Sequence, residues 1–152
     1  MVAIASRPIE WLNGAMAEGI ALLFTRVALA GIFWRSARTK VEDGSFLTIK
    51  ETTFYQFSDA PFNQVPLING DLGAYVTTCT EHLLPVLLLL GLATRLGALG
   101  VLGMTLVIQT FVFPEAAVWW QTHILWVAMA LVLIVRGGGM FSLDRLIGYR
   151  LG

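Results

Sequence analysis

The sequence predicts an all-α integral membrane protein, a four-helix bundle with a long loop between helices 1 and 2 and a short C-terminal interfacial helix. Hydrophobic residues fill 57% of the 152 positions and charged residues only 13%, whereas soluble domains are nearer half apolar and a quarter charged. The apolar residues form four runs, each able to cross a hydrocarbon core of ~30 Å once flanking residues are included. This excludes a soluble enzyme, a disulfide scaffold and a multidomain protein.

We expect a single membrane domain over residues 1–152, with spans placed by the hydropathy. The third and fourth spans contain no formal charge, so they lack the polar outer stripe that a helix of a soluble bundle needs. The net charge of zero leaves no electrostatic footprint for nucleic acid. The predicted spans are residues 15–34, 72–92, 96–113 and 118–135.

The connections between the spans differ in length. Short turns at 91–95 and 114–117 predict antiparallel neighbours. The first connection, residues 35–71, is much longer and keeps several aromatic residues, with Pro61 and Pro66 interrupting it. Because a loop of this length in a small domain is usually functional or folded over a site, we expect a short amphipathic piece lying on the membrane.

Glycine and serine mark two further features of the chain. Residues 142–150 follow a run of three glycines and predict a surface helix that Ser142 caps. In the third span, small residues recur at every third position, which indicates a close approach between helices. These residues are Gly97, Gly100 and Gly103.

Basic residues outside the spans predict the orientation of the protein. Five lie on the side that holds both termini and four on the opposite side, so we expect both termini in the cytoplasm. Residues 1–13 lack a short apolar core with a small-residue cleavage site, so the first span should stay in the mature protein. The five are Arg7, Arg95, Arg136, Arg145 and Arg150, and the four are Arg35, Arg38, Lys40 and Lys50.

The few polar groups inside the spans are the candidates for function. Each ionisable group costs at least ~2.5–3.5 kcal/mol on insertion scales, so such groups normally face the bundle interior and find partners. Counted from the predicted span ends, they lie between the bilayer centre and the face opposite the termini. We therefore expect one cluster that binds a ligand or transfers protons, with catalytic residues unassigned. Its candidate residues are Arg26, Glu81, His82, Gln109, His123 and Trp126.

Within this set, Arg26 and Glu81 are natural counter-charges. An arginine keeps its proton, and a carboxylate is the simplest group to neutralise it in a low dielectric. The same two residues could equally form a structural ion pair that sets the helix register. Pro85 lacks the N–H that would bond the carbonyl of Glu81, which opens the backbone beside the buried carboxyl, although a plain proline kink also explains it.

The two histidines suit a ligand, a proton carrier or a packing role. Cys79 lies three residues before His82 on the same helical face, and with His123 these side chains are weak candidates for a soft-metal site. No histidine pair at i, i+4 and no acidic cluster supports that site, so we predict no metal. The unequal depths of His82 and His123 argue against haem ligation. Trp126 lies deep beside His123 and could stack a flat ligand.

Several stretches together resemble a known family. They are residues 26–33 continuing towards Lys40, Glu81 to Arg95, His123 to Trp126, and the Gly-Gly-Gly-Met-Phe-Ser-Leu-Asp run at 137–144. In combination they resemble the DoxX family of small four-span membrane proteins, over about residues 19–147. The chain departs from it at 137–139, where the family commonly has Gly-Pro-Gly. Arg26, Glu81 and Arg95 match the family pattern, and His123 matches less closely.

The resemblance implies a bacterial inner-membrane protein, since some relatives are similar to quinone-reducing subunits of thiosulfate oxidation systems. Others are associated with membrane oxidoreductase assemblies or oxidative-stress defence. Our first hypothesis is a membrane subunit of a redox system, at most part of an oxidoreductase, which holds a quinone or similar apolar ligand at the polar cluster. Its partners would be the lipid bilayer and a soluble or membrane oxidoreductase subunit. The alternative is a non-enzymatic adaptor or small-solute carrier, with a structural cluster and a partner surface at the aromatic residues 46–62.

Overall fold

The computed structural model describes residues 14–148 and shows four helices long and apolar enough to cross a membrane. Most of the described chain is helical, and its only strand-like feature is an isolated bridge between Val41 and Ile49. The predicted fold class is confirmed. The four candidate spans are α2 (Ala15–Lys40), α4 (Gly70–Leu90), α5 with its extension η2 (Thr94–Val107 and Ile108–Val112), and α6, η3 and α7 in succession (Ala116–Val118, Trp119–His123 and Ile124–Arg136).

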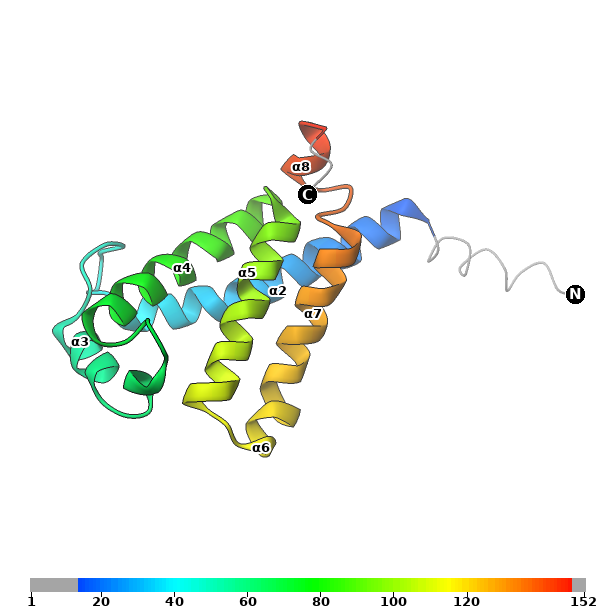
Figure 1. The fold of residues 1–152 in the computed structure, drawn as a ribbon. Helices are drawn as coiled ribbons and strands as arrows, with labels where there is room; N and C mark the ends of the chain where they lie inside the picture. The colour runs from blue at the N-terminus through cyan, green and yellow to red at the C-terminus, as the bar shows by residue number, and fades with distance from the viewer. Residues whose placement is uncertain (1–13, 149–152) are drawn as a thin grey trace, which may run out of the picture.

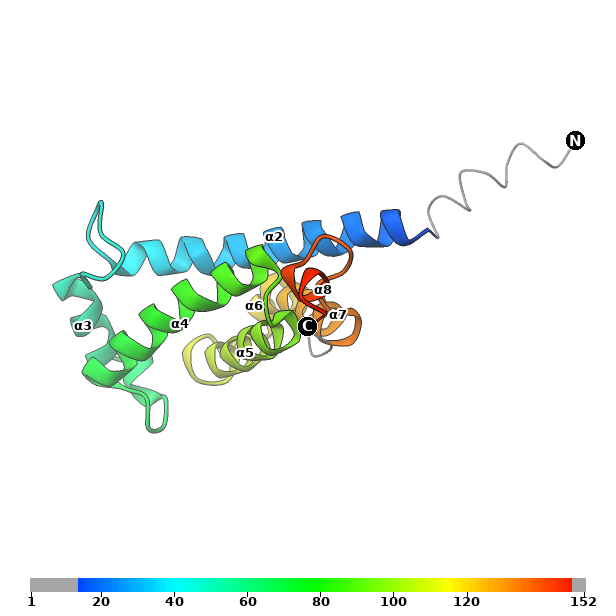
Figure 2. The same cartoon turned by 90° about the horizontal axis from the view of Figure 1, so that it is seen from above.

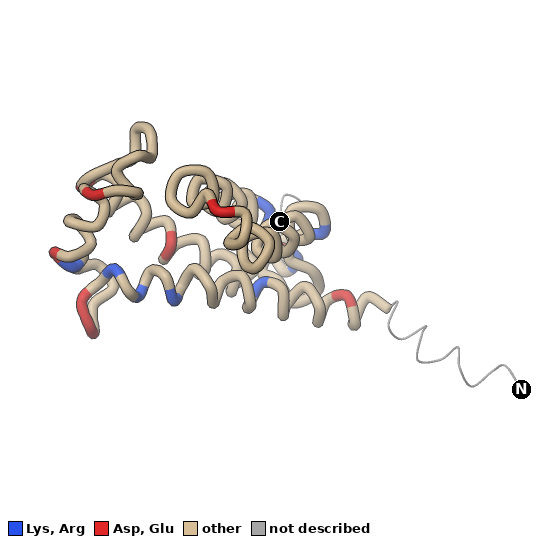
Figure 3. The backbone as a smooth tube through the Cα atoms, turned by 90° about the horizontal axis from the view of Figure 1, so that it is seen from below, with Lys and Arg blue, Asp and Glu red and all other residues tan. Residues whose placement is uncertain are grey.

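The four spans form two pairs that cross each other. Helix α2 packs mainly against α4, and α5 packs against α7 (Figures 1 and 2). The buried apolar core lies where the pairs meet, with Leu29, Phe33, Leu88 and Leu133 almost fully covered. Most charged residues lie at helix ends and in connecting segments (Figure 3). Arg26 and Glu81, which lie inside the spans, are exceptions to this distribution and need partners within the bundle.

Helix α2 continues to Lys40, beyond the expected end at Trp34. The apolar run stops near Trp34, but Arg35, Ser36 and the residues after them keep good helix propensity, and neither glycine nor proline interrupts the segment. Hydropathy marks the width of the apolar layer, whereas backbone hydrogen bonding decides where a helix ends. The extra turns of α2 carry two polar side chains to the site described below.

The long first connection folds back on the bundle. It contains α3 (Glu51–Ser58) and the short helix η1 (Phe62–Gln64), which pack against the first half of α4. Phe54 meets Tyr75 with ring centroids 5.2 Å apart, and Phe57 meets Phe62 at 5.0 Å. The first contact joins α3 to α4, and the second joins α3 to η1.

The C-terminal segment ties the turn between α4 and α5. It contains α8 (Leu143–Leu146), whose N-cap Ser142 accepts a hydrogen bond from Arg145 N–H as predicted. Helix α5 begins without a cap of its own, and the Asp144 carboxylate accepts bonds from the N–H groups of Ala93 and Thr94 and from the Thr94 hydroxyl, at 2.6–2.9 Å. Asp144 N–H in turn donates to Gly91 O at 2.9 Å. The Ser-Leu-Asp motif is therefore a cap supplied from the far end of the chain.

The glycines of α5 play two different parts. A Cβ on Gly97 or Gly100 would meet leucine side chains of α4 at 3.5 Å and 3.0 Å, so these positions allow the close approach that their spacing predicts. A Cβ on Gly103 would find no heavy atom within 4 Å. The close-approach interpretation is therefore wrong for Gly103, because α5 has diverged from α4 by that point in the helix (Figure 1).

Candidate functional site

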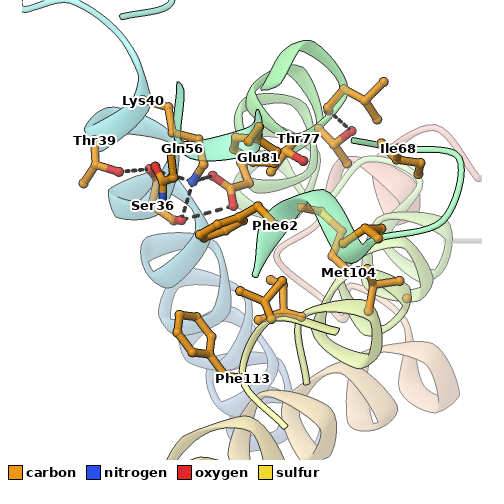
Figure 4. A pocket seen from close by; sticks show the side chains of 18 of the residues that line it. Ser36, Thr39, Lys40, Gln56, Phe62, Ile68, Thr77, Glu81, Met104 and Phe113 are labelled. Carbon is orange, nitrogen blue, oxygen red and sulfur yellow. Dashed lines mark hydrogen bonds and ion pairs between the residues drawn. The ribbon is translucent and has the colours of Figure 1, made fainter. Parts of the chain in front are cut away.

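A cavity of about 540 Å³ lies among α2, α3, η1, α4 and the α5–η2 helix. Its size falls in the range of small-molecule sites, and most of its wall is apolar. Figure 4 shows polar side chains of α2 and α4 at one end, with Phe62, Met104 and Phe113 on other parts of the wall. Phe57 of α3, Phe62 of η1 and Val65, which follows η1, close one side of it. The long connection is therefore folded over this cavity.

A buried ion pair forms the polar end of the cavity. Lys40 Nζ lies 2.6 Å from Glu81 Oε2, and the two side chains are 10% and 3% exposed. Ser36 completes the group, since its hydroxyl donates to Glu81 Oε1 at 3.1 Å and accepts from Lys40 Nζ at 2.9 Å. Ser36 and Lys40 are four residues apart on α2, so the helix presents both on one face. We call Ser36, Lys40 and Glu81 the polar triad.

The predicted ion pair between Arg26 and Glu81 is wrong. The Arg26 guanidinium donates to the carbonyls of Leu88 at 3.1 Å, Leu89 at 3.3 Å and Phe141 at 2.6 Å. The first two are at the C-terminal end of α4, where carbonyls lack helical partners and the helix dipole is negative. A helix end thus takes the place of the expected carboxylate, and Arg26 lies far along α2 from the polar triad.

We therefore expect Arg26 to stabilise the folded protein and not to bind a ligand. Replacing Arg26 by methionine keeps an unbranched apolar stem but removes three hydrogen bonds from a charged donor at a fully buried position. We expect a loss of about 2 kcal/mol in the free energy of unfolding, measured by SDS titration of the protein in mixed micelles. Ligand binding at the cavity should be unchanged in the folded fraction. A variant as stable as the native protein would contradict this assignment.

His82 neighbours Glu81 in sequence but does not line the cavity. Its Nδ1 lies 2.8 Å from the Thr78 carbonyl, to which it donates, and its ring meets the ring of Trp34 edge to face at 5.4 Å. Phe46 of the first connection approaches the same imidazole at 6.5 Å. The structure thus places His82 in an aromatic contact between α2, α4 and the connection.

Gln109, His123 and Trp126 form another separate group. His123 Nδ1 lies 2.6 Å from Gln109 Oε1, and its ring contacts Trp126 with centroids 4.8 Å apart. Trp126 also meets Phe33 of α2 edge to face at 5.5 Å. Gln109 and His123 each lie in a π-helical turn, in η2 and η3. None of the three lines the cavity, and the rings that contact Trp126 here are those of the protein itself.

The weak metal candidates also lie apart. Cys79 is exposed, whereas His82 and His123 have the separate contacts described above. Within residues 14–148, no three His, Cys, Asp or Glu side chains are close enough to hold a metal ion. The single polar cluster expected from sequence is therefore divided: Glu81 belongs to the cavity, and the other five candidates lie elsewhere.

Sequence reasoning missed Ser36 and Lys40. Both follow the apolar run of the first span, so Lys40 counted only as a loop charge and Ser36 was not considered. Their i, i+4 spacing is the signal that could have found them, provided that α2 is extended past Trp34. Thr77, one turn before Glu81 on α4, lines the cavity, whereas its neighbour Thr78 is buried and does not line it.

The polar triad has a defined chemical capacity. An ammonium and a hydroxyl can donate hydrogen bonds to a ligand oxygen, and a carboxylate can accept or return a proton. In the apolar surroundings of the cavity, water competes weakly for these groups. The arrangement suits a ligand with an oxygen-bearing head and an apolar body.

Comparison with known proteins places this architecture in a family. The DoxX family model matches residues 21–114, which is more than half of the chain. The chain belongs to the DoxX family. The matched segment contains every cavity-lining residue, Ser36 to Phe113, so the cavity of this DoxX protein is built wholly by the part that the family model covers. Arg26 also lies inside it, whereas His123 and Asp144 lie outside.

A curated relative of this DoxX protein extends along most of its length. It is an uncharacterized protein of Haemophilus influenzae, 28% identical over 145 residues, with 86% of this chain and 85% of the relative covered. No solved structure matches the chain.

Proposed function

We propose that this DoxX protein is the membrane-embedded subunit of a redox system and binds a quinone in the cavity beside the polar triad. The observation that carries the proposal is a buried Lys40–Glu81 pair at one end of an otherwise apolar cavity. A quinone has matching parts: carbonyl oxygens that accept hydrogen bonds and a ring and chain that prefer apolar surroundings. The family resemblance supports the same ligand class.

Each residue of the triad has a role in this proposal. Lys40 and Ser36 donate hydrogen bonds to a quinone carbonyl. The Glu81 carboxylate takes up a proton from solvent and passes it to the reduced ring. Reduction of a quinone to a quinol takes two electrons and two protons. The electrons come from a partner oxidoreductase subunit that carries a redox cofactor, and the second proton from solvent. The DoxX protein itself positions the quinone ring and delivers one of the two protons.

We place the protein in the bacterial inner membrane with both termini in the cytoplasm. Among residues 14–148, the end that holds the terminal segments carries Arg95, Arg136 and Arg145, and the opposite end carries Arg35, Arg38, Lys40 and Lys50. The excess of basic residues that favours a cytoplasmic terminal side is the count over the whole sequence, five against four, which includes Arg7 and Arg150. Arg7 and Arg150, which also entered the prediction, lie outside the described residues. The polar triad then lies towards the periplasmic face.

Titration with a quinone tests the proposal. Purified protein in nanodiscs is titrated with decylubiquinone, and binding is followed by quenching of tryptophan fluorescence. We expect saturable binding in the native protein and an affinity about 10–100-fold lower in Glu81→Gln, because the neutral amide loses the charge-assisted bond that holds the Lys40 ammonium in position to donate to the quinone. Glu18→Gln is the matched control, since Glu18 pairs with Arg136 at an exposed site on α2 outside the cavity. Absence of saturable binding in the native protein would falsify the proposal.

An adaptor role is the second candidate, favoured by the exposure of aromatic rings on the first connection. Phe46 is 59% exposed and Tyr55 is 63% exposed. If the protein acts only as an adaptor, substitution of these rings releases a co-purified partner while Glu81→Gln retains it. A redox subunit shows quinone binding that depends on Glu81 whether or not the rings are changed.

A further inference from the structure

Several residues that line the cavity are also exposed: besides Ile68 in the first connection and Phe113 after η2, they form two groups. One group is polar, Thr39 on α2 and Gln56 on α3. The other is apolar, Val76 on α4 with Gly103 and Val107 on α5. Since α4 and α5 are candidate membrane spans, exposed apolar residues on them face lipid. The cavity thus has a mouth towards lipid between α4 and α5.

The surroundings of the three glycines on α5 show how this mouth forms. Near the turn that joins them, α4 and α5 are close, and Cβ atoms on Gly97 and Gly100 would contact Leu88 and Leu84. Further along, the helices splay apart (Figures 1 and 2), and a Cβ on Gly103 would meet open space. Gly103 contributes no side chain at the point where the helices have separated. It therefore leaves the widest passage that any residue type allows there.

We propose that the mouth between α4 and α5 admits the apolar chain of a bilayer-resident quinone, with Gly103 as the residue that keeps the passage open. This inference rests on the proposed function and adds that the ligand belongs to the long-chain class and enters from lipid. The ring lies at the polar triad, which α2 and α4 supply, and the chain leaves past α5. Lateral entry spares the chain a transfer through water, where each methylene is unfavourably hydrated.

The test compares two quinones with the same ring. Decylubiquinone carries a long chain, and its counterpart has hydrogen in place of that chain. Both are titrated into the native protein and into Gly103→Leu, which places a branched side chain in the passage. Gly31→Leu is the matched control, because Gly31 lies exposed on α2, has no heavy atom within 4 Å of a built Cβ, and does not line the cavity. Partition of decylubiquinone into the nanodisc lipid is the same for the native protein and both variants, so it does not affect the comparison.

We expect Gly103→Leu to weaken decylubiquinone binding at least about tenfold, equivalent to lost burial of roughly two methylene groups, and to leave the chain-free quinone unaffected. Gly31→Leu should bind both quinones like the native protein. Equal binding of decylubiquinone by Gly103→Leu and native protein overturns the inference, as does an equal loss for both quinones. Gly103→Ala, which adds only a Cβ, should have an intermediate effect and serves if the leucine variant folds poorly.

The two proposals fail in different ways. If native protein binds the chain-free quinone but Gly103→Leu does not discriminate against the chain, lateral entry is wrong and the quinone site stands. If native protein binds neither quinone, the proposed function is wrong and the entry route falls with it. The chain-free quinone therefore reports on the polar triad alone.

Discussion

Replacing Glu81 alone by leucine is expected to lower the free energy of unfolding by about 3 kcal/mol, whereas replacing Lys40 and Glu81 together by methionine and leucine changes it little. The single change leaves the ammonium of Lys40, only 10% exposed, without its carboxylate. Breaking one side of a buried pair typically costs about 3–5 kcal/mol, while an apolar pair of similar volume is often neutral or stabilising. SDS titration in mixed micelles measures both variants.

The double variant separates stability from function. If the pair is kept for ligand binding, the double variant folds like the native protein and loses decylubiquinone binding. Glu18→Gln is the control for this experiment also, since the Glu18–Arg136 pair is exposed and an exposed pair contributes about 1 kcal/mol or less. A double variant that binds the quinone with native affinity would show that the triad has no part in the site. A double variant as unstable as Glu81→Leu would show that the pair is needed for folding.

Replacing Asp144 by alanine is expected to be equally damaging, with a loss of about 3 kcal/mol. Its carboxylate accepts three hydrogen bonds at the start of α5, and Asp144 is 2% exposed. Losing a helix cap alone costs about 0.5–2 kcal/mol, and buried donors left without partners add about 1–3 kcal/mol. Thermal unfolding in detergent, followed by circular dichroism, measures the change.

Two further variants define the origin of that effect. Asp144→Asn keeps one oxygen acceptor and should lose about half as much stability as alanine. Arg145→Ala alters the next residue of α8, whose side chain is exposed, and should behave like the native protein. If Asp144→Ala unfolds at the native temperature, the C-terminal segment does not hold the turn between α4 and α5. Quinone affinity of the folded variants should be unchanged, because Asp144 lies outside the cavity.

Three charged residues show how far the sequence leads to the site. Glu81 could be selected because a carboxylate inside an apolar run is costly unless it has a partner. Its partner could not, since Lys40 follows the apolar run and hydropathy does not distinguish a continuing helix from a loop. Arg26 was paired with the wrong group, because backbone carbonyls at a helix end are good acceptors for a guanidinium and have no signature in side-chain sequence.

The sequence alone determined the fold class and the number of membrane spans, through its composition and hydropathy. This is because the free energy of transferring a residue into lipid depends mainly on its own side chain and little on its neighbours. The location and membership of the cavity depended on tertiary structure. It needs α2 to extend to Lys40, α4 and α5 to diverge beyond Gly100, and the connection to fold over the gap. These are relations between segments distant in the chain, and hydrogen bonding and packing between helices establish them only when all the segments are in place.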